Sequence, residues 1–200
     1  MLDFDGVIAD SLDVTVAAQV TVMTAHGFPR LASAEALLRM VQANWFEGMR
    51  TEGVTAQAGD DIDDYIARAL AAGEFGPFAD IPRVVARLGA RHDVLVVTSN
   101  RGDIVEGFLQ RHGITGVAGV LGNEVAASKV EKIGLARRRH AGADGAWYVG
   151  DTVGDIAEAR AAGARTIAAA WGWHTREQLA RAKPDHVAAT PADLLVLLDA

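Results

Sequence analysis

Two aspartates separated by one residue stand near the start of the sequence, in the segment Asp3-Phe4-Asp5-Gly6. If this segment ends a β-strand, alternation places Asp3 and Asp5 on the same side, and Gly6 permits close backbone approach or an unusual φ just beyond. Two carboxylates there need a cation. A carboxylate beside Mg²⁺ can attack phosphorus in line, and a second one nearby can shuttle the proton of the leaving oxygen.

Two other interpretations compete for this first cluster. One is a turn that carries incidental acids, and the other is a calcium-binding loop. The calcium loop fails because no helix can precede residue 3 and because the twelfth position is Val14 rather than Glu.

A second acidic cluster, Gly150-Asp151-Thr152-Val153-Gly154-Asp155, follows an apolar run and precedes a helical pattern. Asp151 and Asp155 therefore stand near a helix start, where acids are also common as simple caps and dipole partners. Together with the first cluster, they would supply hard oxygen ligands from two strand ends. Such ligands make an octahedral Mg²⁺ site that keeps waters and a substrate phosphate.

Two weaker signals lie between these clusters. Thr98 ends an apolar run and could offer its hydroxyl, with the Ser99 amide, to a phosphate oxygen, although such a pair is often plain turn chemistry. Lys129 is the first residue of a predicted helix, where a positive charge is unfavourable because it opposes the helix dipole. A functional role would explain a lysine at this position. Lys132, one turn later, competes for the same role, and a surface lysine remains the alternative.

The elements that must position these residues alternate between strand and helix. We expect strands at residues 1–2, 94–97, 117–121, 146–149, 166–170 and 186–188. We expect helices at residues 81–90, 103–111, 129–140 and 155–162. Buried parallel strands whose carboxyl ends carry function fit this pattern, so the predicted fold class is α/β, a doubly wound parallel sheet.

Residues 12–79 break this alternation because they show helix-period apolar residues and no convincing strand. The predicted division is a core of residues 1–11 and 80–200 with a small helical insert of residues 12–79. Within the insert, residues 42–47 include Trp45 and are a candidate specificity loop, although helix core is the commoner role for such aromatic residues. His174 follows a predicted strand on the functional side, and a structural role is favoured there.

Composition restricts the class of protein. The chain has 200 residues, 50% of them hydrophobic and 22% charged, which suits a globular protein. The absence of cysteine excludes disulfides and thiolate metal sites, and the net charge of −7 argues against nucleic-acid or anionic-membrane partners. Without a recognisable secretory signal or long apolar run, we expect a cytoplasmic protein, as a monomer or weak homodimer, with a small phosphorylated metabolite as its partner.

The four elements, taken in order, resemble the four motifs of the haloacid-dehalogenase-like superfamily of phosphatases and mutases. Asp3-Phe4-Asp5-Gly6 resembles motif one, residues 97–100 motif two, Ser128-Lys129 motif three and residues 150–155 motif four. The resemblance covers the whole chain and points to the branch of phosphoglycolate phosphatases and β-phosphoglucomutases with a C1-type helical cap. It also implies a longer first strand than Met1 and Leu2 provide, so either this strand is short or the start of the gene product is missing.

The resemblance implies a role for each matching position. Asp3 would be the nucleophile and Asp5 the general acid and base. The phosphoryl oxygens would be held by Thr98, the Ser99 amide and Lys129, the last without the proline that commonly follows it in this family. The cofactor would be Mg²⁺, with Asp3, the backbone carbonyl of Asp5 and Asp151 as ligands and Asp155 in the inner or outer shell.

The expected function is Mg²⁺-dependent hydrolysis of a small phosphomonoester through an aspartyl phosphate. The presence of Asp5 matters because the dehalogenases of this superfamily lack a second aspartate there. The alternative is a phosphomutase that acts on a sugar phosphate with the same nucleophile. A mutase needs insert groups that grip a second phosphate or sugar, and the cationic candidates are Arg30, Arg39, Arg50 and Arg68.

Overall fold

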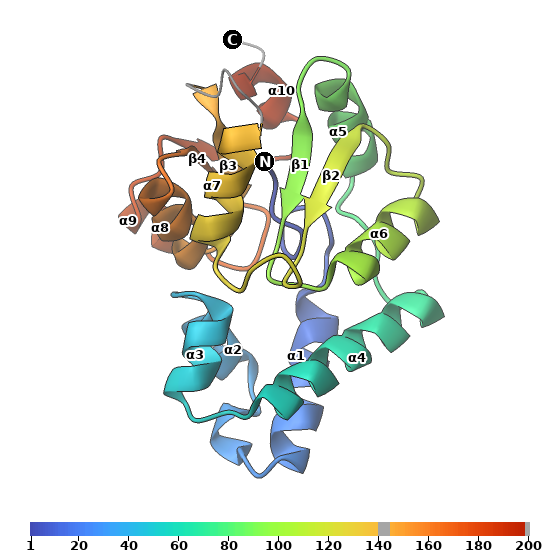
Figure 1. The fold of residues 1–200 in the computed structure, drawn as a ribbon, viewed down its shortest axis with the longest axis vertical. Coiled ribbons are helices and arrows are strands. Elements are labelled where there is room, and N and C mark those ends of the chain that lie inside the picture. The colour runs from blue at the N-terminus through green and yellow to red at the C-terminus, as the bar shows by residue number, and fades with distance from the viewer. Residues whose placement is uncertain (140–144, 199–200) are drawn as a thin grey trace.

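A parallel sheet with helices on both faces forms one part of the molecule (Figure 1). The computed structural model describes residues 1–139 and 145–198. The strands are β1 (Val94–Val97), β2 (Val117–Leu121), β3 (Trp147–Gly150), β4 (Arg165–Ala169) and β5 (His186–Ala188). The helices of this part are α5 (Ile81–Gly89), α6 (Gly102–Arg111), α7 (Lys129–Arg139), α8 (Val153–Ala161), α9 (Arg176–Arg181) and α10 (Asp193–Leu198).

The first expected strand is reduced to a single residue in the middle of the sheet. Leu2 forms parallel bridges to Val96 of β1 and to Val149 of β3. Its N–H donates to the carbonyl of Leu95, and its carbonyl accepts from the N–H of Val97. The pairs β1–β2 and β3–β4–β5 are therefore joined through Leu2, and the strand order is β2, β1, Leu2, β3, β4, β5.

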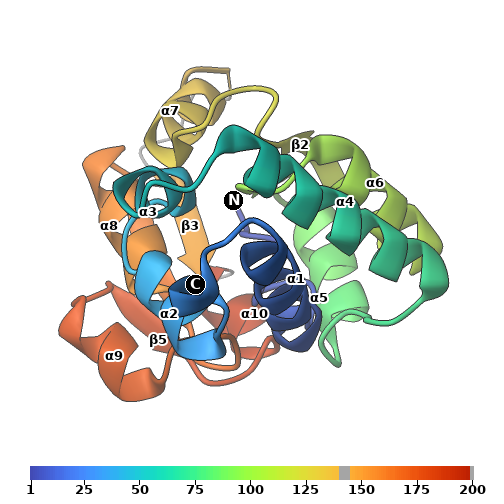
Figure 2. The same cartoon turned by 90° about the horizontal axis from the view of Figure 1, so that it is seen from below.

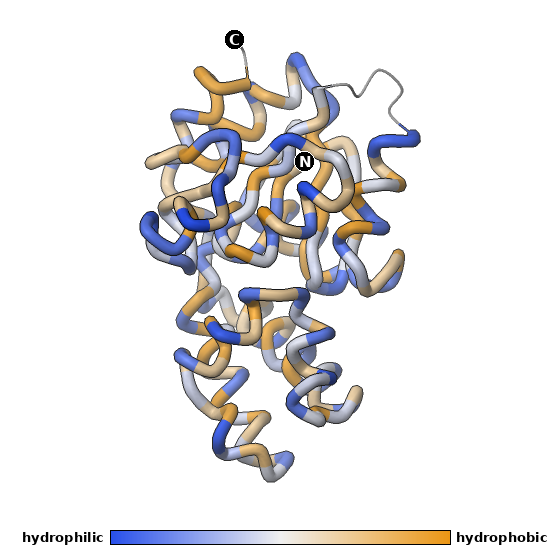
Figure 3. Tube along the Cα trace, turned by 90° about the vertical axis from the view of Figure 1, so that its left-hand side faces the viewer, coloured by the Kyte–Doolittle hydropathy of each residue, from blue (hydrophilic) through white to orange (hydrophobic). Residues whose placement is uncertain are grey.

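Alternation along the strands sends neighbouring side chains to opposite faces of the sheet. Val96 and Val149 pack in a cluster with residues of α5, α6 and α10, whereas Leu95, Val97 and Tyr148 pack with residues of α7 and α8. Figure 3 shows hydrophobic segments gathered in this part of the molecule. Both faces of the sheet are thus covered, and the predicted doubly wound α/β fold is confirmed.

The predicted helices differ from the observed ones only at their ends. The helix expected to begin at Asp155 begins two residues earlier, at Val153, because Thr152 caps it. The Thr152 hydroxyl accepts the N–H of Asp155, and the Asp155 carboxylate accepts the N–H of Thr152, which forms a capping box. The helix expected to end at His140 is observed to Arg139, and residue 140 lies outside the described residues.

The segment between the first aspartates and the sheet folds into helices that lie together below the carboxyl ends of the strands (Figure 1). They are α1 (Leu12–Ala25), the 3₁₀ turn η1 (Pro29–Leu31), α2 (Ala34–Met40), α3 (Trp45–Thr51) and α4 (Ala56–Ala72). Seen from below, these helices lie across the sheet region (Figure 2). We refer to residues 12–79 as the insert.

The two chain segments that connect the insert to the sheet region are hydrogen-bonded to each other. Ala9 and Pro77 form an antiparallel bridge. The N–H of Asp10 donates to the carbonyl of Gly76, and the N–H of Phe78 donates to the carbonyl of Ile8. The insert therefore leaves and re-enters the sheet region at one place.

Candidate active site

The carboxylate of Asp3 lies at the carboxyl edge of the sheet, directly after Leu2. The residue is 4% exposed. Its Oδ1 accepts the N–H of Phe4 at 2.8 Å, and its Oδ2 lies 2.6 Å from the Nζ of Lys129. Phe4 points the opposite way and packs edge to face on Phe108, with ring centroids 5.0 Å apart. The buried Phe4 therefore fixes the backbone that directs Asp3 toward the site.

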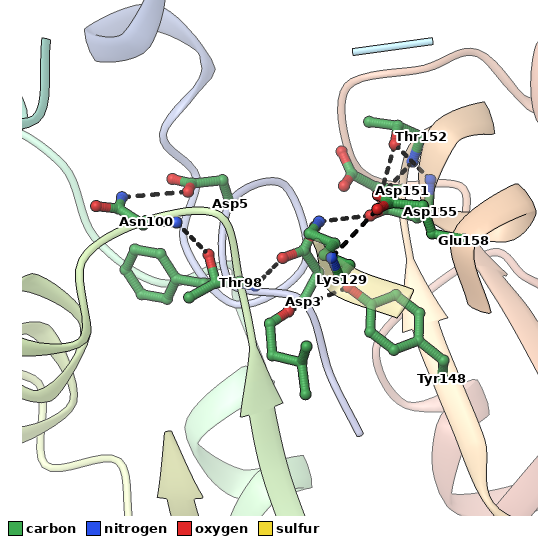
Figure 4. Close-up of polar contacts among 12 residues, drawn as sticks. Asp3, Asp5, Thr98, Asn100, Lys129, Tyr148, Asp151, Thr152, Asp155 and Glu158 are labelled. Atoms are coloured by element: carbon green, nitrogen blue, oxygen red, sulfur yellow. Dashed lines mark hydrogen bonds and ion pairs between the residues drawn. The ribbon is translucent and has the colours of Figure 1, made fainter. Parts of the chain in front are cut away.

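Asp5 lines the same cavity as Asp3 but has its own hydrogen-bond partners (Figure 4). The Ser11 hydroxyl donates to its Oδ1 at 2.7 Å, and the Asn100 amide donates to its Oδ2 at 3.3 Å. Burial raises the pKa of Asp5 above the usual value, against the opposing effect of these two donors. A carboxyl group with a raised pKa can keep a proton to give to a leaving oxygen.

Gly6 lets the loop after Asp5 approach the second acidic cluster. Its φ is +73°, and a Cβ at this position would lie 1.9 Å from the Oδ2 of Asp151. Both properties that the sequence predicted for this glycine, a positive φ and close approach, are therefore confirmed. A side chain larger than hydrogen would displace Asp151.

The end of β1 supplies Thr98, Ser99 and Asn100 to the cavity. The Thr98 hydroxyl accepts the N–H of Asn100 at 3.0 Å, and this turn also directs the Asn100 side chain to Asp5. Thr98 and Ser99 were expected from the sequence, whereas the contact of Asn100 with Asp5 was not. Its position directly after Thr98-Ser99 was the available signal.

The two candidate lysines occupy different places. The Nζ of Lys129 lies 2.6 Å from both Asp3 and Asp155, whereas the Nζ of Lys132 donates to the backbone carbonyl of Thr98. Burial alone would lower the pKa of Lys129, but Asp155 and Asp3 outweigh it and hold this pKa well above its usual value. Burial, together with Lys129, lowers the pKa of Lys132 to about 8. Of the two, only Lys129 lines the cavity.

Asp3, Asp151 and Asp155 form a buried acidic cluster, in which one ligand atom from each residue lies within 4.8 Å of the others. The Oδ2 of Asp151 accepts the N–H of Trp173 at 2.7 Å, but its Oδ1 is buried with no hydrogen-bond partner in the part of the chain that the structure describes. Burial, Asp155 and Asp3 together raise the pKa of Asp151 well above its usual value. A divalent cation would remove this unfavourable burial of charge, and an all-oxygen donor set suits Mg²⁺.

Asp155 has less freedom to bind a cation than the other two. Its Oδ2 accepts the N–H and the hydroxyl of Thr152 at 3.0 and 2.7 Å, and its Oδ1 faces the Nζ of Lys129. Lys129 keeps the pKa of Asp155 below its usual value, although burial acts in the opposite direction. The geometry thus favours Asp155 as the residue that orients Lys129 and supports the metal site from outside.

All seven site residues expected from the sequence line one cavity between the insert and the carboxyl ends of the strands: Asp3, Asp5, Thr98, Ser99, Lys129, Asp151 and Asp155. Its volume is about 80 Å³. One water needs about 10–15 Å³ on this scale, so there is room for roughly five to eight water-sized groups. The cavity therefore has room for a phosphoryl group.

Polar contacts hold the insert against the sheet region. The Asn44 amide donates to Glu158 at 2.9 Å, and the Asn123 amide donates to Asp63 at 3.2 Å. His174 is buried, accepts the N–H of Val153 at its Nδ1, and lies 3.2 Å from the carbonyl of Leu38 through its Nε2. This position agrees with the structural role that the sequence favoured for His174. None of these contacts had a signal in the sequence because each joins distant segments.

Known proteins share the sequence pattern and the fold. Residues 1–169 match the model of the family described as haloacid dehalogenase-like hydrolase. The phosphoglycolate phosphatase of Synechococcus elongatus is 28% identical over 98% of this chain and 94% of that protein. Among the described residues, no helix is both long and apolar enough to cross a membrane.

Solved structures have the same fold across nearly their whole length. A haloacid dehalogenase-like hydrolase from Streptococcus pneumoniae gives a TM-score of 0.76 at 22% identity and covers 98% of this chain and 96% of that one. A protein from Clostridium acetobutylicum, described as a predicted phosphatase, gives a TM-score of 0.82 at 17% identity and covers 100% and 97%. At these identities the likeness is one of fold.

Proposed function

We propose that this chain, which belongs to the haloacid dehalogenase-like hydrolase family and is a phosphatase of that family, hydrolyses a small phosphomonoester with Mg²⁺ and carries the phosphoryl group on Asp3. The observation that supports this proposal most is the position of the Asp3 carboxylate. It lies in the cavity between the insert and the strand ends, 2.6 Å from Lys129 and beside two further buried carboxylates.

In the proposed first step, a carboxylate oxygen of Asp3 forms a bond to phosphorus while the ester oxygen leaves. Asp5 gives its proton to that oxygen, so that the product is a neutral alcohol. In the second step, Asp5 takes a proton from water, and the water oxygen attacks the aspartyl phosphate. Inorganic phosphate leaves, and the Asp3 carboxylate is restored.

The other residues of the site bind and orient the phosphoryl group. Thr98, the Ser99 amide and Lys129 are proposed to hold its oxygens, and Asp155 keeps Lys129 in place. Asp3, the backbone carbonyl of Asp5 and Asp151 would hold Mg²⁺, which when bound neutralises charge on the phosphoryl oxygens. The insert is proposed to act as a cap that excludes bulk water from the cavity and leaves room for the attacking water molecule.

A phosphomutase is less consistent with the insert. None of the four arginines named as candidates for holding a second phosphate lines the cavity. Arg30 pairs with Glu52, Arg50 and Arg39 are exposed, and Arg68 lies over the ring of Tyr65. We therefore favour transfer of the phosphoryl group to water.

Mg²⁺ dependence is the first testable consequence. Excess chelator should abolish release of nitrophenolate from p-nitrophenyl phosphate, and added Mg²⁺ should restore it. Loss of a residue that only supports a metal ligand typically costs about 10–100-fold. Asp151 is proposed as a ligand itself, so Asp151→Asn should lower turnover by more than this. Ca²⁺ should inhibit because its looser, higher coordination gives a geometry poor for in-line attack.

A matched control for Asp151→Asn is Asp13→Asn, which makes the same change on the exposed side of α1. This variant should retain wild-type turnover and the wild-type Mg²⁺ requirement. Full activity of the wild-type protein in excess chelator would contradict the proposed metal dependence.

Closure of the insert is tested at Gly154, where α8 meets the insert. A Cβ added there would lie 2.5 Å from the carbonyl oxygen of Ala43 and 2.7 Å from that of Val41. Gly154→Ala should therefore hold the insert away from the cavity and lower kcat/KM by about 10–100-fold, while the thermal transition stays cooperative.

Gly59→Ala is the control for this variant because it adds the same methyl group within the insert. Its Cβ would meet only the Cε of Met49, at 3.7 Å. If both variants kept the wild-type kcat/KM for p-nitrophenyl phosphate, contact between α8 and the insert would be unnecessary for catalysis.

A further inference from the structure

The wall of the cavity that faces the phosphoryl site is built by the insert. Most of the residues it contributes are apolar: Leu37, Val41, Ala43, Trp45, Ile62 and Ile66. Any part of the substrate beyond the phosphoryl group must lie against this wall. Its chemistry therefore selects the alcohol that leaves.

Cationic groups are missing from this wall. Lys129 is the one Lys or Arg among the described residues that line the cavity, and it is already paired with Asp3 and Asp155. The start of α3 lies at the cavity, but the N–H groups of Phe46 and Glu47 both donate to the side chain of Asn44. This helix end therefore offers little to a second anion.

Negative charge is abundant in the same cavity. Six carboxylates line it: Asp3, Asp5, Asp63, Asp151, Asp155 and Glu158. Asp63 is the one that the insert contributes, and the amide of Asn123 holds its Oδ2 from the opposite side. Burial raises the pKa of Asp63 to about 6. A substrate carboxylate or second phosphate would meet this acid and would lose its hydration against the apolar residues.

Neutral polar groups complete the lining. The Nε1–H of Trp173 and the Oγ1 of Thr15 are both buried and have no hydrogen-bond partner among the described residues, and both residues line the cavity. An indole N–H only donates, a carboxylate only accepts, and a threonine hydroxyl does both. A substrate hydroxyl can pair with any one of these groups, whereas a carboxylate can pair only with the donors and an ammonium only with the acceptors.

We infer that the substrate is the phosphate ester of a small, uncharged, hydroxyl-bearing alcohol, and that Asp63 with the apolar wall of the insert discriminates against a second anionic group. This inference rests on the phosphatase function proposed above and names its substrate class. Hydrolysis would release the neutral alcohol and inorganic phosphate. Asp63 acts here on specificity and takes no part in the phosphoryl transfer.

Three esters of equal carbon number test the inference with the wild-type protein and Mg²⁺. Hydroxyethyl phosphate, phosphoglycolate and phosphoethanolamine differ in the terminal group, which is a hydroxyl, a carboxylate or an ammonium. The kcat/KM for hydroxyethyl phosphate should exceed the other two by about tenfold, since a buried polar group without its partner typically costs about 5–150-fold. Equal or faster hydrolysis of phosphoglycolate would overturn the inference, as would preference for phosphoethanolamine.

The role of Asp63 is tested by Asp63→Asn, which keeps an oxygen acceptor and removes the charge. The ratio of kcat/KM for hydroxyethyl phosphate to that for phosphoglycolate should fall by about tenfold, because repulsion of the carboxylate is lost. Asp64→Asn makes the same change one residue later, at an exposed carboxylate that pairs with Arg101, and should leave the ratio unchanged. An unchanged ratio in Asp63→Asn would overturn the role of Asp63.

Failure of the inference can be told apart from failure of the proposed function. Hydrolysis of p-nitrophenyl phosphate that needs Mg²⁺ supports the phosphatase chemistry whichever small ester is preferred. If this hydrolysis occurs and phosphoglycolate is the best of the three esters, the substrate class is wrong and the phosphatase stands. If none of the four esters is hydrolysed, the proposed function itself fails.

Discussion

Replacement of Asp3 by Asn is expected to abolish turnover, with a loss of several orders of magnitude in kcat for every ester. An amide has neither the charge nor the nucleophilicity of a carboxylate, and the Nζ of Lys129 would lose the negative charge of its partner 2.6 Å away. No phosphoenzyme should form. Phosphate release and intact-protein mass spectrometry after a rapid quench measure both expectations.

Asp3→Ala is the companion variant. The amide of an Asn at position 3 could hydrolyse slowly and restore aspartate, whereas Ala has no group that could do so. Both variants should unfold cooperatively, which shows that lost activity is not lost structure. Normal turnover in either variant would exclude Asp3 as the group that attacks phosphorus.

Asp5→Asn should fail at a different step, because it removes the proton carrier and keeps the nucleophile. p-Nitrophenolate hardly needs a proton to depart, so Asp3 should still be phosphorylated. Hydrolysis of the aspartyl phosphate needs a base, and its loss typically costs about 10²–10⁴-fold. The expected record is a burst of about one nitrophenolate per enzyme, followed by very slow turnover.

An ester with a poor leaving group provides the contrast for Asp5→Asn. Hydroxyethyl phosphate needs protonation of the departing oxygen, so its burst should also be slow. The Asn side chain can still accept the hydrogen bond from Ser11, which limits structural change at the site. Wild-type turnover without accumulated phosphoenzyme would show that Asp5 is not the acid and base.

The chemistry at the strand ends could be predicted from the sequence because it depends on local rules. Asp3, Thr98 and Asp151 each follow a buried apolar run, and parallel strands bring their carboxyl ends to one edge. The positive φ of Gly6 follows from residue type in the same way, whereas the cap at Thr152, which starts α8 two residues before the predicted Asp155, was missed.

The groups that define the rest of the cavity could not be predicted, because each depends on contacts between distant segments. Asp63 belongs to an acidic run in α4, and only the fold places it near Asn123. The choice between Lys129 and Lys132 was also open in the sequence. One turn of helix separates them, and the packing of α7 on the sheet decides which one reaches Asp3.

The paired connections at Ala9 and Pro77 make the insert a unit that can be exchanged as a whole. Because its two ends are fixed side by side, recombination at these points can exchange one helical insert for another without breaking a strand of the sheet. Each doubling of the inserted length costs only about 0.6 kcal/mol in loop-closure entropy. If the insert selects the substrate, as proposed above, exchange of whole inserts changes the substrate while the hydrolytic residues are kept, and a laboratory chimera joined at these residues should inherit the specificity of the insert's donor.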